Sequence, residues 1–192
     1  TSVKTRIIVD STADLMPEIK QQVHVVPLTV CFGTEEYIDG VTIDHKTFYE
    51  KLVESDVLPT TSQASPFAFE EMFRAAVEEG HHVVCITVSS KLSGTYQSAC
   101  GAKEIADNKD DIEVFNTRTL CGPHRYMVEK ALSMANAGAT MEEILHTLEE
   151  CRDNCHSYLI VQDFDFLRRG GRLTPVAAKF ASALNVKPIM EQ

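Results

Sequence analysis

The fold is decided by the stretch from His82 to Ala99, which reads HVVCITVSSKLSGTYQSA. Its first seven residues form an almost continuous apolar run, which is typical of a strand buried on both faces of a parallel sheet. The polar turn Ser89–Thr95 follows at once, and small residues then favour a helix at Ala99–Ala106. A buried strand, a polar turn and a helix in this order are the repeating unit of layered α/β folds.

Strand-like and helical patterns alternate along the rest of the chain, which predicts a Rossmann-like α/β/α domain around a parallel sheet. The other expected strands are Arg6–Val9, Val23–Phe32, Ile112–Phe115, Tyr158–Val161 and Val186–Met190. The other expected helices are Ile43–Val53, Ser65–Gly80, Met141–Cys151 and Thr174–Leu184. Turns or loops are expected at Asp10–Asp14, Tyr37–Gly40 and Asp56–Ser65.

Composition narrows the class of protein. Of the 192 residues 44% are apolar and 24% charged, close to globular averages, which excludes a disordered tail or a collagen-like fibre. No apolar run approaches the roughly 18 residues that a membrane span needs. The net charge of −10 disfavours nucleic acids and anionic membrane surfaces but not a small anionic ligand. Neither a P-loop nor a G-x-G-x-x-G motif occurs, so no nucleotide cofactor is predicted.

The six cysteines show no regular spacing, so we expect reduced thiols in a cytoplasmic protein. Cys151, Cys155 and His156 are close in sequence, but a fourth ligand and a second close pair are missing, and no zinc site is predicted. The chain begins with Thr1 rather than Met, which suggests processing or trimming.

Two hydroxyl-rich loops are the candidates for ligand binding, Thr60–Ser65 and Ser89–Thr95. The second lies where a buried strand ends and a helix begins, a place at which open α/β sheets bind ligands and helix N–H groups attract anions. Gly94 would allow a ligand to approach the backbone closely. Helix capping by Ser65 or Ser93 is the alternative, and the residues alone leave it open for Ser93.

Catalysis has less support in the sequence. A nucleophilic serine needs a base within hydrogen-bond reach, and His81 and His82 lie at the opposite end of the strand from Ser93. The arginines around Gly170-Gly171, at positions 168, 169 and 172, form the strongest basic cluster. We interpret that cluster as a solvated turn in preference to an anion or partner site.

Taken together, these segments resemble the DegV family of bacterial fatty-acid-binding proteins. The most specific block is SSKLSGTYQSA at Ser89–Ala99 with TSQAS at Thr61–Ser65 upstream. The other matching segments are Ile8–Leu15, Val26–Leu28, Tyr37–Gly40, Phe48-Tyr49, Leu167, Gly170–Leu173 and Val186–Ile189.

The resemblance implies a carrier with an acyl chain buried between an α/β domain, residues 1–155, and a second α+β domain that starts at 156–192; residues 41–80 are expected to pack with the second domain. It implies that loop hydroxyls hold the fatty-acid carboxylate, that the protein does no chemistry, and that a separate fatty acid kinase is a partner. The matching site residues are Thr61, Ser62, Ser93, Gly94, Thr95 and Ser11. Two alternatives are a hydrolase or acyltransferase that uses Ser93, and a carrier of a phosphorylated metabolite.

The chain departs from the family pattern in three places. Ala64 stands where proline is frequent, and Phe115–Thr117 with Cys121–His124 replace an Asp-Ser and glycine-rich stretch, which affects the start of the next helix. The family also continues beyond Lys187-Pro188-Ile189, and there a histidine near the carboxylate is expected. The second domain is therefore expected to be incomplete in this chain.

Overall fold

The main sheet of the computed structural model, which describes residues 3–55, 59–119 and 121–154, is parallel. Its strands are β1 (Thr5–Asp10), β2 (His24–Val26), β6 (His82–Thr87) and β7 (Ile112–Asn116), in the order β2-β1-β6-β7. Sequence reasoning identified β1, β6 and β7 within a residue or two. The predicted parallel α/β class is confirmed.

The two central strands are buried on both faces, as the apolar run in β6 predicts. Ile8 of β1 lies opposite Cys85 of β6, and Ile7 lies opposite Val84. Because successive side chains of a strand point to opposite faces, Ile8 and Cys85 belong to one hydrophobic cluster, whereas Ile7 and Val84 belong to another. The sheet therefore has a core on each side.

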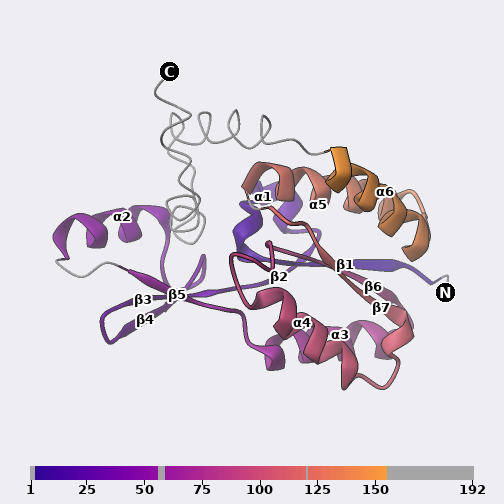
Figure 1. Cartoon of the computed structure of the whole chain (residues 1–192), viewed down its shortest axis with the longest axis horizontal. Helices are drawn as coiled ribbons and strands as arrows, with labels where there is room; N and C mark the ends of the chain where they lie inside the picture. Colours follow the sequence, from indigo (N-terminus) through magenta and orange to yellow (C-terminus); the bar gives the residue numbers. More distant parts are fainter. Residues whose placement is uncertain (1–2, 56–58, 120, 155–192) are drawn as a thin grey trace.

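Helices cover both faces of this sheet, which makes three layers (Figure 1). On one face lie α3 (Pro66–Glu78) and α4 (Thr95–Glu104); on the other lie α5 (Cys121–Asn136) and α6 (Met141–Asn154). Phe69 and Phe73 anchor α3, while Ile144 and Leu148 anchor α6, and all four side chains are fully buried.

Local capping sets the predicted helix starts. Ser65 accepts a hydrogen bond from the Phe67 N–H at 3.2 Å and precedes Pro66, the first residue of α3. Asp44 likewise caps α2 (His45–Glu54). At the predicted capping box the Thr140 hydroxyl accepts from the Glu143 N–H at 3.2 Å and donates to the Glu143 carboxylate at 3.2 Å.

A second, antiparallel sheet corrects three predictions. It consists of β3 (Thr29–Phe32), β4 (Glu35–Ile38) and β5 (Thr60–Ser62), in the order β4-β3-β5. The run Val23–Phe32 is two strands in two sheets, since Pro27 cannot donate to a ladder and breaks it. Tyr37 and Ile38 are strand rather than turn, and the predicted loop Asp56–Ser65 contains β5.

The remaining elements are short helices that precede β7 in the chain. They are η1 (Ser11–Ala13), α1 (Pro17–Lys20) and η2 (Lys109–Asp111). The altered stretch before α5 still starts that helix at Cys121. Within the range 41–80, α3 packs on the main sheet, and the packing of residues 41–80 with a second domain stays a prediction.

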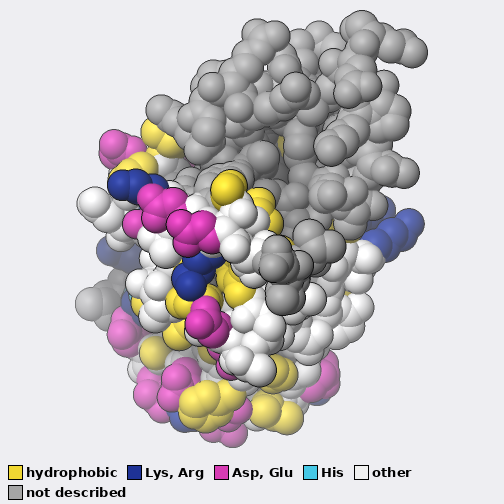
Figure 2. Space-filling model, turned by 90° about the vertical axis from the view of Figure 1, so that its left-hand side faces the viewer, with side chains coloured by type: hydrophobic (Ala, Val, Ile, Leu, Met, Phe, Trp, Pro, Cys, Tyr) yellow, Lys and Arg dark blue, Asp and Glu magenta, His cyan; other side chains and the backbone are white. Residues whose placement is uncertain are grey.

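The strands and helix expected between Tyr158 and Met190, and the basic turn, lie outside the described residues. No helix in the described part of the chain is long and apolar enough to cross a bilayer. Figure 2 shows acidic side chains scattered among basic and apolar ones over one face, with no broad basic patch among its described residues.

Candidate functional site

The chain reverses its direction of travel across the sheet between β1 and β6, where ligand crevices form in open α/β folds. From β1 it continues to β2 on one side, and from β6 to β7 on the other. Asp10 ties the two strand ends together: its carboxylate accepts from the Val88 N–H at 2.6 Å and from the Thr12 N–H at 2.9 Å. The Thr12 hydroxyl donates to the same carboxylate, which is fully buried.

The loop after β6 is held in shape by its own hydrogen bonds. The Leu92 and Ser93 N–H groups donate to the Ser89 carbonyl at 3.0 and 3.2 Å. Ser90 and Asn116, at the end of β7, exchange two hydrogen bonds through the Ser90 N–H and hydroxyl. The site at this loop is therefore largely preformed.

Ser93 and Thr95 share one hydroxyl contact. Their oxygens lie 2.8 Å apart, the Thr95 oxygen accepts from the Ala64 N–H at 3.3 Å, and the Ser93 oxygen accepts from the Thr95 N–H at 3.2 Å. Two hydroxyls carry two protons, and their mutual contact uses one, so one O–H can donate to a further acceptor. Thr95 is fully buried, so the half-buried Ser93 is the group that presents this donor.

The start of α4 adds to the attraction for an anion at this place. Gly94 is the N-cap residue and Thr95 begins the helix. The first N–H groups of a helix have no partner within it, and the helix dipole is positive at this end. Ser93 thus takes part in a local cap-like bond and can also face a ligand.

The two predicted loops contact each other through Gln63. This residue lies in the TSQAS motif but is not among the site residues expected from the sequence. Its side-chain amide donates to the Ser98 hydroxyl at 3.0 Å. A Cβ at Gly94 would lie 1.7 Å from the Gln63 Oε1, so a larger residue at this position would require the end of the Gln63 side chain to move. The end of the Gln63 side chain thus lies beside Gly94, and ligand contact at Gly94 stays a prediction. Gln63 is the third residue of the TSQAS motif, so the motif already contained the residue that joins the two loops.

Thr61 and Ser62 point to opposite faces of β5, because they are neighbours in a strand. Thr61 lies opposite the buried Val30 and shares its face, whereas Ser62 lies opposite Thr29 and is exposed. The side chain of Ser62 therefore cannot join Thr61 at one carboxylate.

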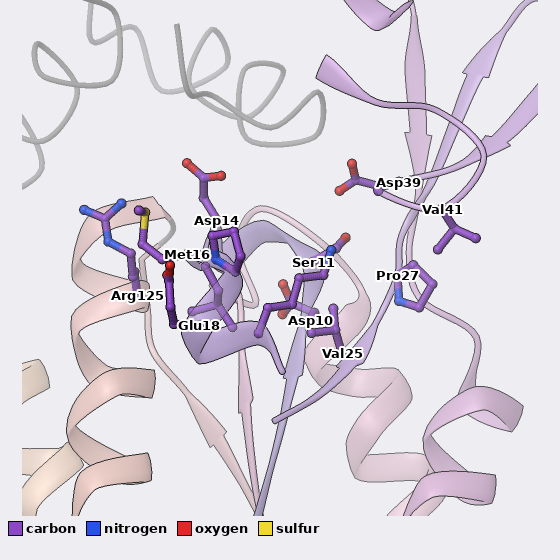
Figure 3. A pocket seen from close by; sticks show the side chains of 14 residues that line it. Asp10, Ser11, Asp14, Met16, Glu18, Val25, Pro27, Asp39, Val41 and Arg125 are labelled. Carbon is purple, nitrogen blue, oxygen red and sulfur yellow. The ribbon is translucent and has the colours of Figure 1, made fainter. Parts of the chain in front are cut away.

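Ser11 lies in a different part of the structure from the other predicted site residues. Its oxygen accepts from the Leu28 N–H at 3.0 Å, and its hydrogen bond to Asp39 lowers the pKa of that carboxyl. Both functions of the hydroxyl are thus used inside the protein. Ser11 lines a cavity of about 640 Å³ together with Asp10, Asp14 and Asp39 (Figure 3), and none of the other predicted site residues lines it.

His124 is a buried group that sequence reasoning left unassigned. Its Nδ1 lies 3.3 Å from the Thr12 hydroxyl and its Nε2 lies 3.1 Å from the Ile86 carbonyl oxygen. Burial lowers the pKa of its imidazole. With Asp10 it flanks Thr12 in the manner of a nucleophile and its base, but all three residues are completely buried, so no substrate reaches that hydroxyl.

Comparison with known proteins assigns the chain to a protein family. The family model described as "Uncharacterised protein, DegV family" matches residues 4–192. The chain belongs to the DegV family. A DegV domain-containing protein of Clostridium perfringens is 40% identical over 186 residues, which cover 96% of this chain and 66% of that relative. The chain thus spans about two thirds of the length of such DegV relatives.

Solved DegV structures share the fold. A DegV family protein from Thermus thermophilus, described with fatty acid binding, has a TM-score of 0.72 at 33% identity, over 79% of this chain and 54% of that one. DegV of Bacillus subtilis, described as a fatty acid binding protein, has a TM-score of 0.70 at 31% identity, over 79% and 55% of the two chains. The predicted resemblance to DegV proteins is confirmed.

Proposed function

We propose that this chain binds a long-chain fatty acid and holds its carboxylate at the start of α4. The observation that carries the proposal is the hydroxyl pair Ser93 and Thr95, which keeps one O–H available at a helix N-terminus. Thr61 supplies the second hydroxyl from the core face of β5. The description of the related Thermus and Bacillus proteins as fatty acid binding supports the ligand class.

The two ends of a fatty acid contribute differently. Each buried CH₂ of the tail contributes about 0.8 kcal/mol, so the tail supplies most of the affinity. The carboxylate needs enough hydrogen-bond donors to replace water, which neutral hydroxyls and helix N–H groups provide without a buried cation. We place the tail between the α/β domain, residues 1–155, and the second domain that begins at residue 156.

In this proposal the protein is a carrier that presents the fatty acid to a separate kinase and does no chemistry itself. In the described part of the chain the hydrogen bonds of the Ser93 hydroxyl run to Thr95. A hydrolase would need a base within reach of Ser93.

Mass spectrometry of ligands extracted from the purified protein tests the proposal. We expect a long-chain fatty acid, and delipidated protein should bind palmitate or oleate at micromolar concentration. Recovery of a phosphorylated metabolite instead would favour the second kind of carrier. Stoichiometric labelling of Ser93 by a fluorophosphonate would favour a hydrolase, and Ser62→Ala provides an exposed serine variant as its control.

A further inference from the structure

The side-chain carboxyl group of Asp39 is buried, and one of its oxygens is unsatisfied. The residue is 4% exposed, and its Oδ2 has no hydrogen-bond partner among the described residues. The hydroxyl of Ser11 provides a hydrogen bond to this carboxyl group, which leaves Oδ2 as the open acceptor. A buried polar atom without a partner lowers the stability of a fold, so Oδ2 indicates a donor that binds there.

The backbone fixes the position of this carboxyl group. The Asp39 N–H donates to the Leu28 carbonyl at 3.0 Å, and the Gly40 N–H donates to the Ile43 carbonyl at 3.1 Å. Gly40 has a φ of +74°, which favours glycine, so the turn directly after Asp39 is well defined. Figure 3 shows the carboxyl group of Asp39 pointing into the cavity that it shares with Ser11.

The cavity is large enough for a small organic molecule. Its volume is about 640 Å³, and ligand sites in proteins have roughly 300–1,000 Å³. It lies between the segment that follows β1 and the turn that follows β4. Apolar side chains form part of its wall, namely Leu15, Val25, Pro27 and Val41. An apolar body therefore has room beside the open oxygen of Asp39.

The charges around the cavity determine the sign of its ligand. Its ionisable lining groups are Asp10, Asp14, Glu18, Lys20, Asp39 and Arg125, with more acidic than basic members. Burial raises the pKa of Asp39 to about 6, and the charge of Lys20 opposes this shift only in part. Asp39 is therefore mostly ionised at pH 7, and the excess of carboxylates repels an anion and attracts a cation.

A primary ammonium group matches these features more closely than other cations. It is a compact charge with three N–H donors, and it can bond to a single oxygen. A guanidinium bonds carboxylates in a fork that uses both oxygens, whereas only one oxygen of Asp39 is open. A metal ion needs several ligands, and no group of three His, Cys, Asp or Glu side chains that could hold one occurs among the described residues.

We propose that the Asp39 cavity binds a small primary amine in its ammonium form. The ammonium group donates to Oδ2 of Asp39, and the hydrocarbon body of the amine lies on the apolar wall formed by Val25, Pro27 and Val41. This inference does not depend on the proposed fatty-acid site, because Thr61 and Ser93 are not among the described residues that line the cavity.

Titration of the full chain with butylammonium chloride, followed through the backbone amide NMR signals of Ser11 and Gly40, tests the proposal. We expect saturable binding with a Kd of about 1 mM or lower. Butan-1-ol has a similar size but no charge and should bind at least about tenfold more weakly, because hydrogen bonds between charged groups are the stronger ones. Absence of saturation up to about 20 mM amine, or equal affinity for amine and alcohol, would overturn the proposal.

Two variants that each remove one negative charge locate the bound ammonium group. Asp39→Asn keeps the shape of the side chain, and we expect the affinity for butylammonium to fall at least about tenfold. Glu36→Gln removes an exposed charge from the neighbouring strand β4 and should change the affinity less than about twofold. Equal losses in the two variants would indicate a general attraction of cations to this acidic chain and would overturn the proposal.

The pKa of Asp39 in the unmodified chain decides the matter even if Asp39→Asn does not fold. A positive charge beside a carboxylate favours its ionised form and lowers its pKa. Saturating butylammonium should therefore lower the pKa of Asp39, measured by NMR, from about 6 to about 5 or below. An unchanged pKa would mean that the amine binds elsewhere and would overturn the proposal.

Discussion

Ser93 and Thr61 carry the proposed contact with the carboxylate, and their substitution separates ligand binding from capping. Ser93→Ala and Thr61→Ala each remove a hydrogen bond to a charged group, worth about 1.5–3 kcal/mol. We therefore expect palmitate affinity, measured by calorimetry on delipidated protein, to fall about tenfold to a hundredfold. Ser62→Ala, on the opposite face of β5, should leave the affinity within about twofold.

A fatty alcohol of the same length sharpens this prediction, because it lacks the anion. It should bind the wild type more weakly and respond less to Ser93→Ala. If Ser93 only capped α4, the alanine variant would lose about 1 kcal/mol of stability and keep its affinity. Equal sensitivity of acid and alcohol would mean that the hydroxyls shape the pocket without holding the charge.

His124 gives the stability of the fold a predictable dependence on pH. Burial lowers the pKa of its imidazole below 6.5 in the folded state, with Asp10 and the Ile86 carbonyl opposing the shift. Below pH 6.5 the unfolded chain therefore binds more protons than the folded one, and stability falls as the pH falls through this window. We expect urea unfolding to show a smaller loss between pH 7 and pH 5.5 for His124→Gln than for the wild type. His24, whose pKa is also lowered, remains in both proteins. Identical slopes would assign the pH dependence to other groups.

At the scale of elements, sequence patterns predicted those segments whose burial is uniform or strictly periodic. The apolar run of β6 and the spacing of Phe69, Phe73 and Ala76 in α3 are such patterns, since all these side chains face a core. The small sheet was missed because its strands are only three or four residues long and β5, TTS, is polar. Its pairing with β3 is set by tertiary contacts, which a local pattern does not contain.

In the candidate site, too, the sequence predicted local relations between residues and missed those between distant segments. The sequence placed Ser93 and Thr95 at a helix start because loop and helix are contiguous in the chain. The sequence did not show that Thr61 and Ser62 point to opposite faces, because the face of each depends on the strand register. It also did not show that Ser11 lies away from the other site residues, because the partners of Ser11, Leu28 and Asp39, are distant in sequence. The contact of Gln63 with Gly94 also joins distant segments.

Helix α3 offers a matched test of its buried face. Phe69 is fully buried and its ring centroid lies 5.9 Å from that of Phe73, whereas Phe67 is 62% exposed. Phe69→Ala should lower the free energy of unfolding by about 3–5 kcal/mol. Phe67→Ala, in the same helix, should change it by no more than about 0.5 kcal/mol. Urea denaturation measures both, and equal losses would mean that α3 is not docked through Phe69.

For the whole molecule, the state of the cysteines reports on both fold and redox environment. Cys31, Cys85, Cys100 and Cys151 are unpaired thiols. We predict six adducts after alkylation under denaturing conditions without reductant, read by intact mass, since the chain has six cysteines. In the folded protein Cys85 should react more slowly than Cys31, Cys100 and Cys151, because it is fully buried and burial raises its pKa. Two missing adducts would indicate a disulfide.

The central position of β1 has a consequence for synthesis of the chain. Its neighbour β6 begins only at His82, which pairs with Thr5. At 5–20 residues per second a ribosome needs roughly 4–15 s to make the intervening segment. During that interval the apolar stretch Ile7–Val9 has no central partner, and such exposed strands are what chaperones bind and what aggregates. Refolding of the complete chain should be slow for the same reason, since contacts between remote segments close late.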